Sequence, residues 1–371
     1  MIPVARPSIG KEELSAINNV FETGWLGLGS VVFEFENKIK EYLPVANVIA
    51  VNTGTTALHI ALDAFEIKSG DEIITPSMTF AASIQAITQT GAVPVFCEIR
   101  ENDLNIDIDD LRKKITSKTK AIMPVHYCGK ACEMETLLEI GKKYNIKILE
   151  DAAHAFGSSY QGKKIGSFGD AACFSFDPIK NITTGEGGAV VLADNEMAEK
   201  IRRKRILGID KDTWHRYKNE RSWFYEVVEQ GYRYHMSNIN AAIGLEQLKK
   251  LNLFIERKRE IVKQYDAAFV SMKGIKILEN DYKETAQFCY IIRILDGKRD
   301  KLMEYLKNEG VGSGVHYIPN HLQPFFKAYA TKLPITEMLG EEIITLPLYF
   351  NMTDKDIALV IKSVKEFFSA S

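Results

Sequence analysis

The sequence predicts an α/β protein with a large domain built on a mainly parallel sheet and a smaller α+β domain after it. First, the chain has 371 residues, more than one hydrophobic core usually supports. Second, short apolar runs alternate with helical patterns from about residue 45. Third, a long amphipathic stretch at 240–269 ends this alternation. We expect the domains to span residues 1–245 and 246–371.

Seven short runs rich in apolar residues predict the strands of the large domain. They lie at 47–52, 71–77, 93–99, 119–127, 146–153, 170–176 and 188–194. Because these runs are almost continuously apolar, both faces of the sheet should be covered by helices. Apolar residues at helical spacing predict helices at 54–65, 79–91 and 134–145.

The order of elements changes after the helix predicted at 240–269, which we expect to join the two domains. A strand at 288–295, "FCYIIRIL", precedes a helix at 298–310 and a final helix from Asp354. This order predicts a small α+β domain.

The composition argues against several classes of partner. The chain is 46% hydrophobic and 26% charged, with a formal net charge of −2 and no basic block. We therefore expect no nucleic acid and no membrane as partner. The N-terminus lacks the pattern of a signal peptide, and the five cysteines are an odd number, so we expect a reduced cytoplasmic protein.

One short stretch, "VHYCGKAC", invites a metal interpretation through His126, Cys128 and Cys132. A closed zinc site needs four ligands, and no second pair of cysteines or histidines stands at ligand spacing. We predict no metal.

The first candidate binding element is "NTGTTALH", where a strand gives way to a helix through Gly54, Thr55 and Thr56. Backbone N–H groups at the start of a helix attract phosphate, and small residues allow a close approach. Neither a Walker loop nor the dinucleotide-binding glycine pattern is present here. An ordinary threonine cap would explain the same residues.

The second candidate element is "ILEDAAHAFG", in which Glu150 and Asp151 end an apolar strand. Alternation sends their side chains to opposite faces of the sheet. A carboxylate beside a basic nitrogen keeps that nitrogen protonated. His154 follows three residues later, and both it and the carboxylates also have ordinary structural interpretations.

The third candidate element is "FSFDPIKNITTGEGGAVVL", which holds Lys180 after an apolar strand and before a glycine-rich turn. A partly desolvated lysine loses its proton readily and attacks carbonyl groups. Most lysines are solvated surface charges, but the flanks of Lys180, with Ser175 before it, are unusual. A phosphate cradle, a carboxylate and a strand-end lysine together suit pyridoxal phosphate (PLP), which has a phosphate, a pyridine nitrogen and an aldehyde.

The sequence resembles the DegT/DnrJ/EryC1/StrS family of PLP-dependent aminotransferases through nearly its whole length. The resemblance rests on "NTGTTALHIAL", "DEIITPSMTFAAS", "PVHYCGKACEM", "GYRYHMSNINAAIGLEQL", "GVHYIPNHLQPFF" and above all "ILEDAAHAFGSSYQGKKIGSFGDAACFSFDPIKNITTGEGGAVV". It implies the fold-type I, aspartate aminotransferase-like fold, with PLP and its pyridoxamine phosphate form as the cofactor.

The resemblance also implies roles for individual residues. Lys180 would form the Schiff base with PLP and move protons as general acid and base. Asp151 would pair with the pyridine nitrogen, and Phe80 would stack on the ring. The other positions implied to bind the cofactor are Gly54, Thr55, Thr56, His154, Ser175 and Asn238.

Asn238 matches a residue that comes from the neighbouring subunit in similar enzymes, so a homodimer with its active site at the interface is implied. Segments that line the sugar side of the pocket in similar enzymes match Trp25, His316 and Tyr317 here, and Glu186 lies near the lysine loop. These positions could equally serve packing or turns. Asp177 departs from the pattern, because many relatives have an aromatic residue or histidine there.

The function implied is transfer of an amino group from L-glutamate to a keto group of a nucleotide-linked deoxysugar. Such products enter surface glycans, including lipopolysaccharide, or antibiotics. A branch of the family with His at the lysine position removes hydroxyl groups instead, so Lys180 favours transamination. A cyclitol ketone or a small keto-phosphate as acceptor, or a non-catalytic binding or regulatory protein, are the alternatives. The sequence leaves open amination at C3 or C4, the stereochemistry, and the dTDP, UDP or GDP carrier.

Overall fold

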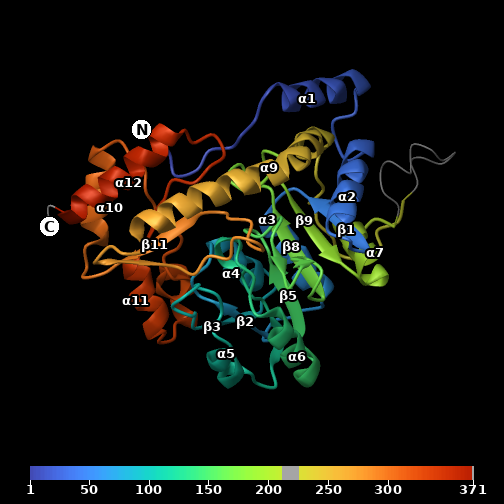
Figure 1. The fold of residues 1–371 in the computed structure, drawn as a ribbon. Coiled ribbons are helices and arrows are strands. Elements are labelled where there is room, and N and C mark those ends of the chain that lie inside the picture. Colours follow the sequence, from blue (N-terminus) through green and yellow to red (C-terminus); the bar gives the residue numbers. More distant parts are fainter. Residues whose placement is uncertain (211–224, 370–371) are drawn as a thin grey trace.

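The computed structural model describes residues 1–210 and 225–369 (Figure 1). Within these ranges the larger sheet has the strand order β1-β9-β8-β5-β4-β2-β3. Its strands are β1 (Asn47–Val51), β2 (Glu72–Pro76), β3 (Val93–Cys97), β4 (Thr119–Ile122), β5 (Lys147–Asp151), β8 (Ala171–Ser175) and β9 (Gly188–Leu192). All seven coincide with predicted runs, so the expected α/β fold with a mainly parallel sheet is confirmed.

Strand β9 is antiparallel to both of its neighbours, β1 and β8, while the remaining pairs are parallel. It follows β8 after a loop at 176–187 with no helical crossover between them, which forces the reversal. The loop therefore lies at the edge where β1, β2, β5 and β8 end. This arrangement brings Lys180 to the carboxyl edge of the sheet.

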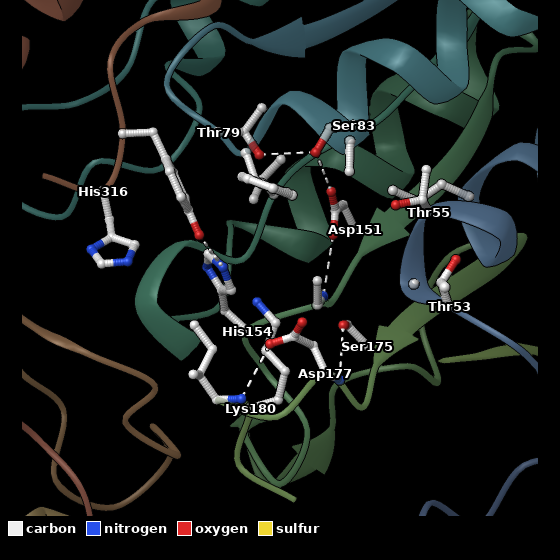
Figure 2. A pocket seen from close by; sticks show the side chains of 18 of the residues that line it. Thr53, Thr55, Thr79, Ser83, Asp151, His154, Ser175, Asp177, Lys180 and His316 are labelled. Carbon is white, nitrogen blue, oxygen red and sulfur yellow. Dashed lines mark hydrogen bonds between the residues drawn. The ribbon is translucent and has the colours of Figure 1, made fainter. Parts of the chain in front are cut away.

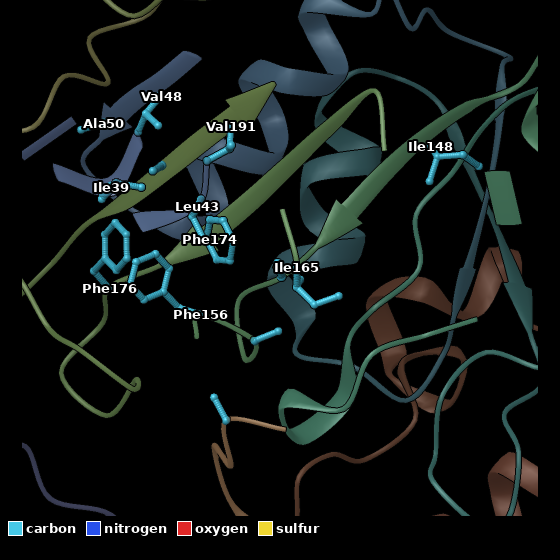
Figure 3. Close-up of a cluster of buried hydrophobic side chains, with 14 of the residues drawn as sticks. Ile39, Leu43, Val48, Ala50, Ile148, Phe156, Ile165, Phe174, Phe176 and Val191 are labelled. Carbon is cyan, nitrogen blue, oxygen red and sulfur yellow. The ribbon is translucent and has the colours of Figure 1, made fainter. Parts of the chain in front are cut away.

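Helices cover the sheet on both faces. On one face lie α3 (Gly54–Ala64), α4 (Ala81–Gln89) and α7 (Asn195–Lys204), and on the other α2 (Ser30–Tyr42), α5 (Ile108–Lys114) and α6 (Met134–Tyr144). Alternate strand residues serve the two cores: Val48 and Ala50 of β1 belong to one, Ile49 and Val51 to the other. Figure 3 shows the cluster that contains Val48 and Ala50, in which the rings of Phe156 and Phe174 pack edge to face.

A separate antiparallel sheet of β10 (Ile275–Ile277), β11 (Tyr290–Ile294) and β12 (Ile343–Leu346) forms the C-terminal unit. Helices α10 (Arg299–Asn308), α11 (Pro334–Glu342) and α12 (Asp354–Ser369) accompany it. The strand, the helix and the final helix predicted after residue 270 are all present.

Helix α9 (Asn238–Phe269) connects the two units, and its residues enter both of their cores. Leu251 belongs to the core of the large sheet, whereas Tyr265 and Phe269 belong to that of the small sheet. The division after residue 245 falls inside this helix and stays a prediction. Ile2, from the other end of the chain, packs in the core of the small sheet.

Several elements were not anticipated. Helix α1 (Lys11–Thr23) packs on α9, and β6 (Ser159–Tyr160) with β7 (Lys163–Lys164) forms a small hairpin. Three short 3-10 helices lie at Tyr127–Gly129, Asn320–Leu322 and Pro324–Tyr329.

No helix in the described part of the chain combines the length and the apolar character needed to cross a membrane.

Candidate active site

A cavity of about 380 Å³ opens at the carboxyl edge of the large sheet (Figure 2). Its walls come from the segments that follow β1, β2, β5 and β8, which is where open α/β sheets place ligands. The C-terminal unit closes one side with His316 and Tyr317. The residues singled out from the sequence that line this cavity are Gly54, Thr55, Phe80, Asp151, His154, Ser175, Lys180, Glu186, His316 and Tyr317.

One corner of the cavity is the start of α3. Thr53 caps the helix, and its hydroxyl accepts the N–H of Thr56 at 3.1 Å. A Cβ atom on Gly54 would lie 2.7 Å from Cβ of Ser175, so glycine is needed for β8 to end against the helix. The first-turn N–H groups of Gly54 and Thr55 have no acceptor within the helix. Together with the hydroxyl of Ser175, they make this corner a site for an anion.

Thr56 lies behind this corner and not on the cavity wall. Its hydroxyl donates to Oδ1 of Asn52 at 2.7 Å and to the carbonyl of Thr53 at 2.9 Å. Successive residues of a helix point in directions about 100° apart, so Thr55 and Thr56 do not face the same cavity. Of the three threonines, Thr53 and Thr55 line the cavity, whereas Thr56 does not.

Asp151 and Glu150 point to opposite faces of β5, as alternation predicts. Asp151 faces the cavity, and its carboxylate accepts the Ser83 hydroxyl at 2.6 Å and the Ala153 N–H at 3.2 Å. Glu150 is fully buried on the other face and contacts Nε2 of His126 at 3.1 Å. Burial raises the pKa of Asp151, and its two hydrogen bonds oppose that rise.

Lys180 projects from the loop between β8 and β9 toward His154 (Figure 2). Its amine lies 4.3 Å from the centre of the Phe288 ring, an aromatic residue of the C-terminal unit. Burial lowers the pKa of Lys180, while the carboxylates of Asp177 and Asp151 act in the opposite direction. A buried amine with a lowered pKa is a better nucleophile near neutral pH.

An aromatic wall stands beside the lysine. The His154 ring stacks on Phe288 at 4.1 Å and 11°, and its Nε2 contacts the Tyr317 hydroxyl at 3.1 Å. The other nitrogen, Nδ1, is buried without a hydrogen-bond partner among the described residues. Burial lowers the pKa of His154 well below its usual value, so the ring is neutral.

Two further rings complete the cavity. His316 contacts Oγ1 of Thr345 through Nδ1 at 2.9 Å, and burial lowers its pKa to about 4. Phe80, at the start of α4, lies 5.6 Å from Tyr317 between ring centres and is 58% exposed. An exposed aromatic ring at the mouth of a cavity is suited to stack on a planar ligand.

Two of the singled-out residues, Trp25 and Asn238, lie elsewhere in this chain. The side chain of Asn238 donates to the Trp25 carbonyl at 3.0 Å and accepts the Val32 N–H at 3.2 Å. Trp25 lines a second cavity of about 430 Å³, together with Arg233 and His235. Neither residue is on the wall of the cavity that holds Lys180.

The stretch that invited a metal interpretation is held by hydrogen bonds. Nδ1 of His126 accepts the Cys132 N–H at 3.1 Å, and the Cys132 thiol donates to the Val125 carbonyl at 3.2 Å. Cys128 lies beside Cys289, with 2.8 Å between the sulfur atoms. No cluster of three or more His, Cys, Asp or Glu side chains suited to a metal ion occurs within residues 1–210 and 225–369.

The lining residues fit a group that carries a phosphate, a pyridine nitrogen and an aldehyde. A Cβ atom at Gly54 would meet Ser175 and fill the anion corner. Asp151 presents a buried carboxylate, and the half-buried Lys180 presents an amine whose pKa is lowered. The unpartnered Nδ1 of His154 is a further buried polar atom that a ligand can satisfy.

Sequence reasoning missed several residues of this site besides Thr53. Ser83 fixes Asp151, Thr79 contacts the Ser83 hydroxyl at 2.9 Å, and Phe288 covers the lysine amine. Phe288 is far from Lys180 in the sequence, and only the packing of the C-terminal unit brings them together. The run "PSMTFAAS" did contain Thr79 and Ser83, but no periodicity indicates that a hydroxyl there reaches β5.

Comparison with known proteins gives one family. The sequence model of the DegT/DnrJ/EryC1/StrS aminotransferase family matches residues 7–365. The chain is 40% identical to an uncharacterised protein of Methanocaldococcus jannaschii, over 99% of this chain and 98% of that protein. It is 39% identical to the spore coat polysaccharide biosynthesis protein SpsC of Bacillus subtilis, over 98% of this chain and 96% of that protein.

Solved structures agree with the sequence matches. PseC of Helicobacter pylori, an aminotransferase involved in the biosynthesis of pseudoaminic acid, superposes with a TM-score of 0.93 and 31% identity over 100% of both chains. Spr1654 of Streptococcus pneumoniae, described as a sugar aminotransferase and solved in a pyridoxamine phosphate form, superposes with a TM-score of 0.94 and 30% identity over 100% of both chains.

Proposed function

The chain belongs to the DegT/DnrJ/EryC1/StrS aminotransferase family, which uses PLP, and we propose that it transfers an amino group from L-glutamate to the keto carbon of a nucleotide-linked deoxysugar. One observation carries this proposal. A half-buried lysine whose pKa is lowered, a buried carboxylate and an anion-binding helix start converge on a single cavity of about 380 Å³. That volume is within the range of cavities that bind small molecules and cofactors.

In this proposal the cofactor's phosphate lies in the corner made by Gly54, Thr55 and Ser175, with Thr53 beside it. Asp151 holds a proton on the pyridine nitrogen, and Phe80 stacks on the ring. Bound PLP supplies an aldehyde that accepts an amino group and a ring that withdraws electrons from the reacting carbon.

Lys180 holds the cofactor through its amine. With the cofactor bound, the Lys180 amine would carry a proton to or from the substrate carbon as general base and acid. The neutral ring of His154, with its free Nδ1, faces the same cavity and accepts or donates a hydrogen bond to the ligand. Phe288 and Tyr317 exclude water from this side of the amine.

The functions of relatives support a sugar acceptor. SpsC is a spore coat polysaccharide biosynthesis protein, and PseC takes part in the biosynthesis of pseudoaminic acid. The proposed sugar side of the cavity includes His316, Tyr317 and Glu186. We propose that the product enters a surface polysaccharide and that the protein acts in the cytoplasm.

We further propose a homodimer in which the partner subunit completes each site with its Asn238 and Trp25 region. Phe80 is 58% exposed at the mouth of the main cavity. The second cavity, with Trp25, opens beside Leu26 and Leu207, which are 41% and 42% exposed. Exposed apolar groups of this kind mark surfaces that bind a partner.

The test is a two-step assay on the purified protein loaded with PLP. L-Glutamate should change the absorbance of the bound cofactor and release 2-oxoglutarate, and the Lys180→Ala variant should do neither. The aminated enzyme is then offered dTDP-, UDP- and GDP-linked 3-keto and 4-keto sugars, with mass spectrometry of the products.

Each outcome decides between the candidate functions. Amination of one nucleotide-linked sugar supports the proposal and identifies the carrier and carbon. If the enzyme responds to glutamate but aminates only a cyclitol ketone or a small keto-phosphate, that compound is the acceptor and the nucleotide-linked sugar is not. Absence of any bound cofactor would favour a binding or regulatory protein.

A further inference from the structure

A second lysine, Lys258, is buried behind the loop that carries Lys180. It belongs to α9 and is 6% exposed. Among the described residues, no carboxylate lies within ion-pair distance of its amine. Its Nζ donates instead to Oδ1 of Asn181 at 2.9 Å and to the carbonyl of Gln287 at 3.3 Å. A buried lysine with only neutral partners is costly, which calls for a reason beyond packing.

Asn181 directly follows Lys180 and fixes the position of the loop. Its amide group donates to the carbonyls of Phe156 and Ala286, both at 3.1 Å. Because both donors of the amide face these carbonyls, Oδ1 is directed at Lys258. The side chain of Asn181 thereby connects the lysine loop to the segment after β5, to the C-terminal unit and to α9.

The charges around Lys258 come from several elements. A small cavity behind the loop is lined by both Lys180 and Lys258, with Arg6 and Tyr349 as its other titratable groups and no carboxylate on its wall. Burial lowers the pKa of Lys258 to about 8, with the Cys289 thiol opposing and the Lys180 cation adding to that decrease. Near neutral pH, Lys258 is still mostly a cation.

We propose that Lys258 is a positioning residue for Lys180: through Asn181 it fixes the lysine loop, and it places a second cation on the wall of the small cavity that Lys180 also lines. A neighbouring cation destabilises an ammonium group and so favours the neutral, nucleophilic amine. This inference rests on the proposed function of Lys180.

The experiment measures how readily Lys180 reacts at each pH. The protein is mixed with PLP at pH values between about 6.5 and about 10.4, the ordinary pKa values of histidine and lysine. Borohydride then fixes the bond between lysine and PLP, and peptide mass spectrometry quantifies modified Lys180. Wild type is compared with Lys258→Met, Lys258→Gln and Lys258→Arg. Lys249→Met, an exposed lysine of the same helix, is the matched control.

We expect Lys258→Met to raise the midpoint of Lys180 modification by about one pH unit, because one like charge is lost. Lys258→Gln should show the same shift while keeping a donor for Asn181, whereas Lys258→Arg and Lys249→Met should match wild type. Unchanged midpoints in both Lys258→Met and Lys258→Gln would overturn the proposal. If Lys258→Met does not fold, Lys258→Gln decides alone.

Failure of the proposed function is distinguishable from failure of this inference. If PLP modifies Lys180 of the wild type at no pH, the proposed function fails. The midpoint is then measured by acetic anhydride labelling of Lys180 in the same set of variants. A shift of that midpoint in Lys258→Met and Lys258→Gln supports the charge effect of Lys258, and its absence overturns it.

Discussion

The Asp151 carboxylate accepts a hydrogen bond of 2.6 Å from the hydroxyl of Ser83, which joins β5 to α4 at the floor of the cavity. The Ser83 hydroxyl in turn contacts that of Thr79 at 2.9 Å. This chain of hydroxyl groups sets the orientation of the carboxylate, because within the described residues its other hydrogen bond comes from the Ala153 N–H alone. A carboxylate held in this way is suited to meet a nitrogen at a fixed place.

Replacing Asp151 by Asn should lower kcat by about 100-fold or more, because a neutral amide does not hold a proton on the pyridine nitrogen. The shape of the side chain is kept, so the melting temperature should change little. The measurement is steady-state turnover together with thermal unfolding. A variant with wild-type turnover would remove Asp151 from the proposed chemistry.

Ser83→Ala tests the orientation separately from the charge. The carboxylate stays but loses its best donor, so we expect a roughly tenfold loss of kcat, which is smaller than that of Asp151→Asn. The double variant should lose little more than Asp151→Asn alone, since the two residues act as one unit. Additive losses would show that Ser83 acts independently of Asp151.

Lys180→Ala should abolish the covalent attachment of PLP and lower turnover by more than about 1,000-fold, because both the attachment point and the proton carrier are lost. Absorbance of the dialysed protein and glutamate-dependent turnover measure the two effects. Lys113→Ala, an exposed lysine on α5, is the control and should behave like wild type. Retained turnover in Lys180→Ala would refute the assignment.

Gly54→Ala should weaken PLP binding about tenfold, or about 1.4 kcal/mol, because its Cβ would lie 2.7 Å from Cβ of Ser175 and displace the anion corner. Overpacking should also cost about 1 to 3 kcal/mol of folding free energy. PLP titration measures the affinity for the cofactor, and denaturant unfolding measures the folding free energy.

Adding Ser175→Gly to Gly54→Ala relieves the closest contact. We expect stability to recover in the double variant while PLP affinity stays low, since the Ser175 hydroxyl is lost as well. Equal recovery of both quantities would mean that Ser175 contributes no bond to the ligand.

His154 should make the cofactor-free protein lose stability as the pH falls. Burial lowers its pKa well below 6.5 in the folded chain, and the nearby Lys180 cation acts in the same direction, whereas in the unfolded chain it titrates near 6.5. The unfolded state therefore binds the proton first, and the stabilising contribution present above about pH 6.5 decreases below it. Unfolding of wild type and His154→Gln from pH 8 to pH 5 should show the larger loss in wild type. An equal loss of stability in the two proteins over this pH range would contradict the role given to His154.

The features of this site that depend on neighbouring residues could be predicted from the sequence. The contacts between residues far apart in the chain could not. Strand ends predicted Asp151 and Lys180 at one edge, and alternation separated Asp151 from Glu150, because these depend only on residues nearby in the chain. Periodicity does not say which strands are neighbours, so the reversed strand β9 was not foreseen. Phe288 and Lys258 reach the lysine loop only through the packing of the C-terminal unit and α9.

The positions of Thr56, Trp25 and Asn238 have physical reasons as well. Thr56 is turned away by the helical rotation that follows Thr53 and Thr55. Trp25 and Asn238 hold each other in a second cavity, and whether they serve the site of a partner subunit depends on contacts between two chains. A motif indicates which residue is used but not from which copy of the chain.

The position of β9 also governs how the chain assembles. Strand β1 lies at one end of the strand order of the larger sheet and pairs with β9, with Ala50 opposite Ala189. During synthesis on the ribosome, β1 emerges early and remains unpaired until β9 has been made. Long-range pairing of this kind slows folding and leaves an apolar strand exposed to aggregation. The anion corner at Gly54 is therefore completed late, so we expect a nascent chain that ends before about residue 192 to lack the proposed cofactor site.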